Sequence, residues 1–121
     1  MKSPAVLLVA ALTLPAGAEA SRPGFGLDDL SRLADVLEPQ FSPDGEAIVY
    51  SVSTVNQTAD LSQSDLWRVG FDGSGRVRLT DTPEKSEWRP QWSPDGKQLA
   101  FLSDRGDEDA QAQVWIMPAA G

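Results

Sequence analysis

A seven-residue segment occurs twice in this chain, and the two copies differ only in which aromatic residue they carry. The first copy is Pro39–Gly45 and the second is Pro90–Gly96, 51 positions later. The copies also agree downstream, where Leu66–Trp67 corresponds to Val114–Trp115 at a spacing of 48. Self-similarity at a fixed spacing of this size is the signature of a repeat protein. The repeating unit is therefore about fifty residues long.

The N-terminus has the pattern of a secretory signal peptide over residues 1–20. Lys2 precedes the apolar run Ala5–Leu14, and Ala18-Glu19-Ala20 offers a small-x-small site for cleavage after Ala20. The alternative interpretation is a membrane anchor. Ten apolar residues, however, make a helix of about 15 Å, which is roughly half the hydrocarbon thickness of a bilayer. We therefore expect a periplasmic or secreted protein without stable membrane insertion.

Cysteine content and charge narrow the classes of function. The chain contains no cysteine, which excludes a lipid-anchored form of the export signal and any disulfide, so stability has to come from packing. The net charge is −8, and no basic stripe is present for a phosphate backbone. Nucleic-acid binding is therefore not expected, and the sequence indicates no cofactor.

Residues 21–36 are expected to form a lead and a short helix. Leu27, Leu30, Leu33 and Ala34 recur at helical spacing, and Asp28 lies in the first turn, where negative charge suits the helix dipole. From Leu37 onward the pattern changes to that of β-strands.

The remainder predicts short antiparallel strands joined by tight turns. Each repeated segment ends in Ser-Pro-Asp-Gly, in which Pro presets φ and Gly accepts a positive φ, and a strand rich in apolar residues follows it. Polar loops are expected over 53–64 and 103–113, each leading to a strand with a tryptophan, and an outer strand is expected over 76–80. Four such strands per unit describe the blade of a β-propeller.

The predicted fold is all-β: an incomplete β-propeller of about two four-stranded antiparallel blades. The first blade is expected over 37–83 and the second, truncated, over 84–121. Closed propellers need about four to eight blades, so we expect this chain to be the N-terminal piece of a longer protein. The alternative is a complete small β-protein, in which both faces of the central strands would lack cover.

At this point the residues suggest a family. The segments that carry the resemblance are Leu27–Leu30, residues 39–50, Asp65–Val69, Arg78–Thr80 and residues 90–105. The chain resembles the start of prolyl oligopeptidase family serine peptidases, of the acylaminoacyl-peptidase and dipeptidyl-peptidase type. The resemblance implies a propeller that caps a C-terminal α/β-hydrolase domain, which would be its partner, with peptide substrates.

The Trp-Ser-Pro-Asp-Gly repeat is also similar to that of TolB-type envelope propellers. The resemblance to that group implies a separate α/β domain between signal and propeller, whereas here the first repeat starts about twenty residues after the expected cleavage site. The position of the repeat thus favours the peptidase. The alternative stays open: a TolB-like periplasmic propeller that acts as a protein-binding module without catalysis.

No catalytic residue, cofactor site or metal site is assigned to this chain. A serine hydrolase of this type needs a nucleophile on Gly-x-Ser-x-Gly and a histidine base, and the chain has no histidine. Gly73-Ser74-Gly75 is expected to be a hairpin turn. Any peptidase activity of the parent protein would therefore belong to a hydrolase domain outside these residues. The 121 residues themselves are expected to have no catalytic activity.

Three other patterns have a structural and a functional interpretation. The carboxylates Asp104, Asp107, Glu108 and Asp109 crowd one loop, but they lack EF-hand spacing, so a solvated loop is preferred to a calcium site. Of the tryptophans, Trp67, Trp92 and Trp115 are expected in the core and Trp88 in a more open place, in preference to a stacking platform for ligands. The sequon Asn56–Thr58 is read as a polar loop.

Overall fold

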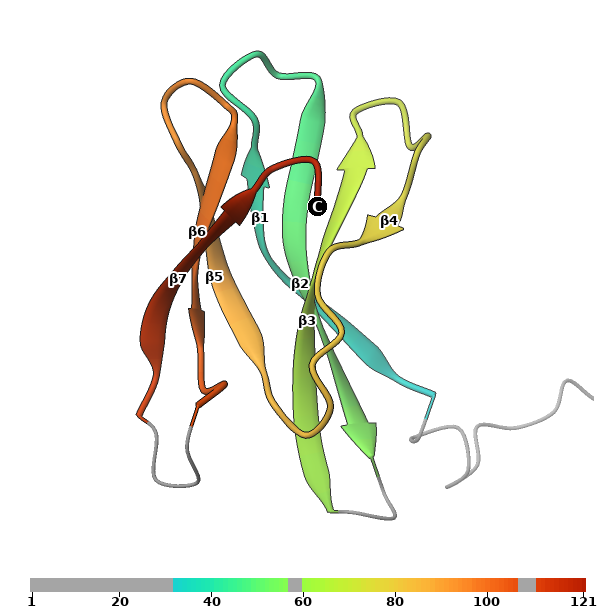
Figure 1. The fold of residues 1–121 in the computed structure, drawn as a ribbon. Coiled ribbons are helices and arrows are strands. Elements are labelled where there is room, and N and C mark those ends of the chain that lie inside the picture. The colour runs from blue at the N-terminus through green and yellow to red at the C-terminus, as the bar shows by residue number, and fades with distance from the viewer. Residues whose placement is uncertain (1–31, 57–59, 107–110) are drawn as a thin grey trace, which may run out of the picture.

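The computed structural model describes residues 32–56, 60–106 and 111–121 and contains two antiparallel sheets in that part of the chain (Figure 1). The first sheet has the order β1-β2-β3-β4, with strands Ala34–Phe41, Ala47–Asn56, Leu61–Gly70 and Val77–Arg78. The second has the order β5-β6-β7, with strands Glu87–Trp92, Gln98–Ser103 and Gln113–Pro118. The all-β prediction is confirmed. The described part of the second sheet has three strands where the first has four.

The repeated Ser-Pro-Asp-Gly segments form the two turns predicted for them. Gly45 and Gly96 have φ values of 75° and 71°, a conformation that costs glycine nothing and other residues about 1 kcal/mol or more. The N–H of Gly45 donates to the Ser42 carbonyl at 2.8 Å, and that of Gly96 donates to the Ser93 carbonyl at 2.9 Å. Each turn therefore reverses the chain between the first two strands of its sheet.

The expected polar loop over 53–64 is wrong. β2 runs on to Asn56 and β3 begins at Leu61, and the two strands stay paired up to Asn56 and Leu61. The hairpin extends beyond the ladder of the second sheet (Figure 1), whose last pair is Ser103 and Gln113. Because this extension lies away from the core, its polar side chains are compatible with strand pairing.

The predicted helical turns over 27–34 fall mostly on residues 1–31, which lie outside the described residues, as does the expected signal peptide. The described residues contain no helix long and apolar enough to span a bilayer. β1 begins at Ala34, three residues before the position where the sequence pattern indicated β-structure.

The innermost strand of each sheet carries the same irregularity. The register of β1 on β2 shifts between Leu37 and Gln40, and the register of β5 on β6 shifts between Trp88 and Gln91, 51 residues later. Each shift contains a non-glycine residue with positive φ. β-bulges of this kind bend a strand and re-aim its side chains.

The two sheets turn opposite faces toward each other, as shown by comparing repeat-equivalent residues. We call one face the leading face; the strand registers place on it, in the first sheet, Val36, Phe41, Ile48, Tyr50, Val52 and Trp67. Its equivalents in the second sheet are Glu87, Trp92, Leu99, Phe101, Ser103 and Trp115. The other is the trailing face, formed in the first sheet by Val49, Ser51, Leu66 and Arg68. In the second sheet it is formed by Ala100, Leu102, Val114 and Ile116.

The core is formed where the trailing face of the first sheet meets the leading face of the second. Val49 and Leu66 are fully buried on one side of this junction, and Leu99 is fully buried on the other, with Phe101 at 3% exposure. Burial of a side chain of this size stabilises the fold by about 1.5 to 3 kcal/mol. Val49, Leu99 and Ala119 form the central cluster, and Trp92 packs against it.

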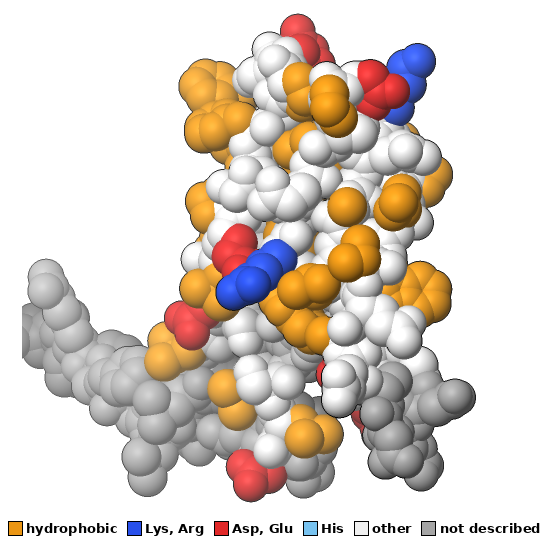
Figure 2. Space-filling view, turned by 90° about the vertical axis from the view of Figure 1, so that its left-hand side faces the viewer, with side chains coloured by type: hydrophobic (Ala, Val, Ile, Leu, Met, Phe, Trp, Pro, Cys, Tyr) orange, Lys and Arg blue, Asp and Glu red, His pale blue; other side chains and the backbone are white. Residues whose placement is uncertain are grey.

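The remaining two faces are open. On the trailing face of the second sheet, Val114 and Ile116 are 69% and 65% exposed, and on the leading face of the first sheet Phe41 is 60% exposed. Figure 2 looks at the side of the molecule that the second sheet forms and shows hydrophobic side chains spread over it. The junction is thus head to tail, because each sheet uses one face and leaves the other uncovered.

Candidate functional site at the junction of the sheets

The described residues offer no arrangement of a nucleophile and a base. Gly73-Ser74-Gly75 lies in the turn between β3 and β4, as predicted: the N–H of Gly70 donates to the Ser74 carbonyl at 2.8 Å, and the Ser74 hydroxyl donates to Asp72 at 2.6 Å. Ser74 is therefore committed to holding a hairpin turn. Without histidine or cysteine in the chain, no general base of those types is available to it.

The acidic loop is described only at its start. Asp104 accepts a hydrogen bond from the backbone N–H of Ser86 at 2.7 Å, which ties the loop to the strand before it. Asp107, Glu108 and Asp109 lie outside the described residues. Within residues 32–56, 60–106 and 111–121 no group of three or more acidic, histidine or cysteine side chains is placed to hold a metal ion.

The two bulges meet at the inner end of the junction. Glu38 and Arg89 are the residues with positive φ in β1 and β5, at 55° and 53°. The Glu38 carboxylate accepts a hydrogen bond from the backbone N–H of Arg89 at 2.6 Å, and its other oxygen lies 3.5 Å from Arg89 Nε. Trp92 Nε1 donates to the Gln40 carbonyl at 3.1 Å close by. Polar contacts therefore fix the two inner strands against each other.

A hollow of about 510 Å³ opens beside this pair. Its polar wall is formed by Glu38, Gln40, Arg89 and Gln91 of the inner strands. Its apolar wall is formed by Ala100, Leu102 and Val114 of the trailing face of the second sheet, with Phe101. The hollow is therefore bounded by an uncovered sheet face.

A second hollow, of about 410 Å³, lies at the turn end of the junction. Charged side chains of both signs line it, the acidic Asp44 and Glu46 and the basic Arg68 and Lys97. Arg68 Nε is buried and has no hydrogen-bond partner among the described residues. This atom is closed off from solvent, so the hollow does not present it to a ligand.

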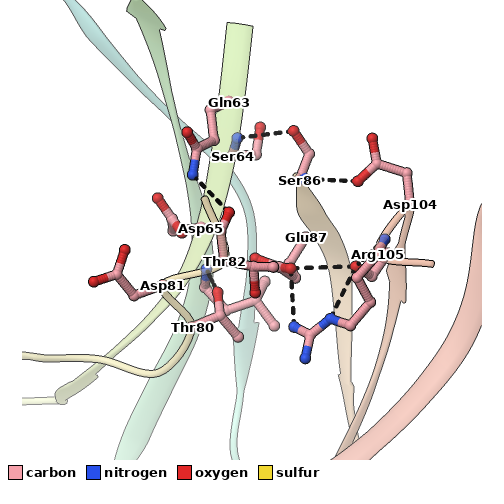
Figure 3. A network of polar contacts seen from close by, with 12 residues as sticks. Gln63, Ser64, Asp65, Thr80, Asp81, Thr82, Ser86, Glu87, Asp104 and Arg105 are labelled. Carbon is pink, nitrogen blue, oxygen red and sulfur yellow. Dashed lines mark hydrogen bonds and ion pairs between the residues drawn. The ribbon is translucent and has the colours of Figure 1, made fainter. Parts of the chain in front are cut away.

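A buried polar network lies in the second sheet at the other end of the junction (Figure 3). Glu87 of β5 is fully buried, and its Oε1 accepts from Arg105 Nη2 at 2.9 Å and from the Ser103 hydroxyl at 3.2 Å. Arg105 also lies over the rings of Phe101 and Trp115, at 5.1 Å and 5.3 Å from their centres. A buried carboxylate needs such a paired and hydrogen-bonded cation, because isolated burial of the charge would be costly.

The first sheet joins this network through the segment that leads from β4 to β5. Gln63 Nε2 donates to the Thr82 carbonyl at 3.0 Å, and the Ser64 N–H donates to the Ser86 hydroxyl at 3.2 Å. The N–H of Leu66 donates to the Thr80 hydroxyl at 2.9 Å. This segment therefore completes the outer edge of the first sheet with side-chain hydrogen bonds where regular pairing stops.

Asp65 is the second buried carboxylate at this end. Its Oδ2 accepts from Arg78 Nη2 at 2.7 Å, and Arg78 also reaches Asp81 at 3.0 Å. Burial raises the pKa of Asp65 above its ordinary value, and the hydrogen bond and charge of Arg78 oppose this only in part. The other oxygens, Asp65 Oδ1 and Glu87 Oε2, are buried with no partner in the described residues.

The aspartates of the two turns have lowered pKa values, in contrast to the raised pKa of Asp65. In both repeats a serine hydroxyl donates to the aspartate two residues on, Ser42 to Asp44 at 2.5 Å and Ser93 to Asp95 at 2.6 Å. A backbone N–H donates to the same carboxylate in each turn. These hydrogen bonds to the charged form lower the pKa of Asp44 and Asp95.

The tryptophans are less uniformly buried than the core prediction supposed. Trp92 packs against the central cluster, and Trp67 is half-buried beneath the guanidinium of Arg76, 5.5 Å from the ring centre. Trp115 remains 38% exposed, and Trp88 is half-buried, not more open than the others. Trp115 is the more exposed of the two because it lies in β7, the edge strand of its sheet, whereas Trp67 lies in β3, which β4 flanks.

Sequence reasoning did not single out Glu38, Arg89 or Glu87. The signal available for the first two was their equivalence: they occupy the same place in the two repeats and carry opposite charges. The site as a whole can hold two sheets in a fixed orientation.

The fold and this junction define a class, that of a β-propeller segment whose sheets stack face to face. The β-propeller domain of the Trilobed protease from Pyrococcus furiosus superimposes with a TM-score of 0.59 at 19% identity, covering 74% of this chain and 26% of that one. At this identity the likeness shows the fold. No protein-family model matches the chain.

Two curated relatives extend the likeness to sequence. The chain is 42% identical over 94 residues to the uncharacterized peptidase YuxL of Bacillus subtilis, covering 78% of this chain and 14% of the relative. It is 43% identical over 74 residues to dipeptidyl-peptidase 5 of Porphyromonas gingivalis, covering 61% of this chain and 11% of the relative. The chain thus resembles a propeller segment of the peptidase family and spans less than a sixth of the length of these relatives.

Proposed function

We propose that this chain is the propeller segment of an exported serine peptidase. The propeller would admit or select peptide substrates for a C-terminal α/β-hydrolase domain. The observation that carries the proposal is the identity of 42% and 43% with two proteins named as peptidases. The first of these matches, over 94 residues, is long enough to include both sheets.

The architecture supports a role in access to the active site. The junction is held by polar contacts at the inner strands, by an apolar cluster in the middle and by the hydrogen bond from Ser64 to Ser86 at the far end. Sheets fixed at three levels make a rigid wall, and a rigid wall beside an active site excludes bulky substrates while short peptides pass. The periplasmic or secreted location expected from residues 1–20 is part of the same proposal.

The test uses the full-length product of the gene, assayed with chromogenic dipeptide and N-acyl amino acid amides and with a folded protein substrate. We expect hydrolysis of the short substrates and none of the folded protein. Loosening the junction through Glu38→Ala should increase cleavage of longer peptides while leaving cleavage of the dipeptide amide unchanged, since Glu38 belongs to the scaffold.

The outcomes separate the two functions that the sequence left open. A full-length product that hydrolyses none of these amides and co-purifies with envelope lipoproteins would favour the binding module. Hydrolysis without any dependence on peptide length would keep the peptidase and remove the role in substrate access.

A further inference from the structure

Both sheets begin at the same end of the molecule (Figure 1). β1 starts at Ala34, which pairs with Thr54 near the end of β2. β5 starts at Glu87, which pairs with Ser103 at the end of β6. We call this end of the sheets the entry end, and the two Ser-Pro-Asp-Gly turns lie at the opposite end. The chain therefore enters both sheets from one side.

The chain also returns to the entry end after its fourth strand. The segment that follows β4 runs back along β3, where the Thr80 hydroxyl accepts from the Leu66 N–H at 2.9 Å. Further along, the Thr82 carbonyl accepts from Gln63 at 3.0 Å, closer to the start of β3. An antiparallel sheet with an even number of strands finishes at the end where it began, because each strand reverses the chain. Whatever follows the last four-stranded sheet of a ring therefore also starts at the entry end.

One element projects from the entry end. The β2–β3 hairpin continues past β1, whose first residue lies opposite Thr54. Its last two pairs are Val55 with Ser62 and Asn56 with Leu61, and no third strand joins them among the described residues. We call these four residues the ribbon. Because a two-stranded hairpin is only marginally stable in water, a surface that covers the ribbon would stabilise it.

The ribbon has the composition of an interface and not that of a protected sheet edge. Strand edges that stay in water are usually guarded by charged side chains. None of the ribbon residues is charged, and neither are the strand residues next to them, 53–54 and 63–64, although 23% of the chain is charged. Depletion of charged side chains is characteristic of the buried centre of protein interfaces.

The exposure of Val55 does not depend on a missing sheet. Strand alternation places Val55 on the trailing face with Val49 and Ser51, and the sheet that packs on this face is present. Val55 is nevertheless 50% exposed beside that sheet, whose ladder ends at Ser103 and Gln113. The side chain therefore remains open to a partner that approaches along the strands from the entry end.

We propose that the ribbon docks on the C-terminal domain that follows the propeller in the same polypeptide. The inference rests on the proposed function, which supplies that domain, and it adds which part of this chain the domain contacts. The chain covers only 14% and 11% of the two relatives, which leaves ample length for such a domain. A domain joined to the ring at the entry end faces the ribbon and not the Ser-Pro-Asp-Gly turns. The contact holds the first sheet of the ring against the domain.

The test places the photoreactive residue benzoylphenylalanine at single positions of the full-length product and maps its cross-links by mass spectrometry. Val55 and Ser62 are the two probe positions, because both are exposed and they pair on the same face of the ribbon. Phe71 is the matched control, an apolar residue that follows β3 at the opposite end of the same sheet and is 68% exposed. We expect cross-links to the C-terminal domain from positions 55 and 62 and none to that domain from position 71.

Mixing isotope-labelled with unlabelled protein before irradiation separates contacts within one chain from contacts between copies, because only the latter join light and heavy peptides. The proposal is overturned if neither probe position cross-links to the domain, if the domain is reached only between copies, or if position 71 reaches it equally. Far-ultraviolet circular dichroism checks the fold, and should one probe variant unfold, the other gives the same readout.

Hydrolysis of the chromogenic amides by the unmodified full-length product separates this proposal from the proposed function. Hydrolysis without cross-links to the domain would remove the docking of the ribbon and keep the peptidase. Cross-links to the domain without hydrolysis would keep the docking and remove the peptidase.

Discussion

Glu38 and Arg89 occupy the same place in the two repeats, 51 residues apart, and contact each other across the junction of the sheets. Both adopt positive φ inside a bulge of the innermost strand. The Glu38 carboxylate binds the N–H that the Arg89 bulge turns out of the ladder, at 2.6 Å. The backbone N–H that the bulge of the second repeat leaves unpaired is thus hydrogen-bonded by a side chain of the first repeat.

The first prediction concerns this backbone conformation. A residue other than glycine at positive φ costs about 1 to 2 kcal/mol, so Arg89→Gly should be more stable than Arg89→Ala by about 1 kcal/mol. Both changes remove the side chain and keep the N–H that Glu38 binds, so their difference isolates φ. Urea unfolding followed by tryptophan fluorescence measures it.

Gln91, two residues on in the regular part of β5, is the control. There glycine should be less stable than alanine by about 0.5 to 1 kcal/mol, because glycine loses more chain entropy on folding. The same sign at both positions would contradict the role of φ at Arg89.

The sequence allowed the turns and the strand order to be predicted because their determinants are local. Gly45 and Gly96 lie at the turn positions that require positive φ, and Asp44 and Asp95 close the same turns with side-chain hydrogen bonds. The repeat then supplies the fold class, since two equal units of this kind have to stack.

The predictions are wrong or incomplete where contacts between distant parts of the chain, and not the local sequence, determine the conformation. The polarity of residues 53–64 predicts a loop, yet Ser53 pairs with Ser64 in the ladder, and the Ser53 hydroxyl lies 3.0 Å from that of Ser62. A hairpin that projects from the sheet needs no apolar face, so polarity carries no information there. Glu38 and Arg89 were missed because nothing local marks a charged residue for positive φ.

The second prediction compares two equivalent residues on differently covered faces. Leu66 is fully buried and Val114, at the same place in the second repeat, is 69% exposed. Leu66→Ala should cost about 2 to 5 kcal/mol through lost contacts and a cavity. Val114→Ala should change stability by no more than about 0.5 kcal/mol in dilute solution. Equal costs in chemical denaturation would mean that the two faces are equally covered.

The third prediction concerns the buried Glu87. Arg105→Ala removes its only cationic partner among the described residues, and leaving a buried charge unpaired costs about 3 to 5 kcal/mol. Because Arg105 is partly exposed, we expect the lower end of this range, about 3 kcal/mol. Glu87→Gln in the same chain should recover part of the loss, since a neutral amide tolerates burial better than an unpaired carboxylate.

A double-mutant cycle of these two substitutions measures the coupling between Glu87 and Arg105. The cycle separates the charge pair from the packing of Arg105 on Phe101 and Trp115, because the aromatic contacts are lost equally in both arginine variants. Strictly additive costs would show that the ion pair contributes nothing and that Arg105 acts through stacking alone.

The last prediction follows from the turn aspartates and their lowered pKa. The carboxyl group has a lower pKa in the folded state than in the unfolded state. At a pH between these two pKa values the unfolded state therefore binds more protons, and stability rises with pH. Asp44 and Asp95 therefore stabilise the fold above the ordinary value of 3.8, and this contribution is lost as the pH falls through their lowered values. Ser93→Ala removes the largest cause of the shift at Asp95, so the pKa of Asp95 should rise toward 3.8.

Carbon-13 NMR titration of the carboxyl groups checks this at both turns in one sample. In Ser93→Ala the pKa of Asp95 should move and that of Asp44 should stay, and Ser42→Ala should give the reverse, because each serine donates only within its own turn. The two repeats thereby serve as controls for each other. A shift of both aspartates in either variant would show that the turns are coupled through the junction, and an unchanged Asp95 in Ser93→Ala would assign the lowered pKa to the backbone N–H of Lys97 instead.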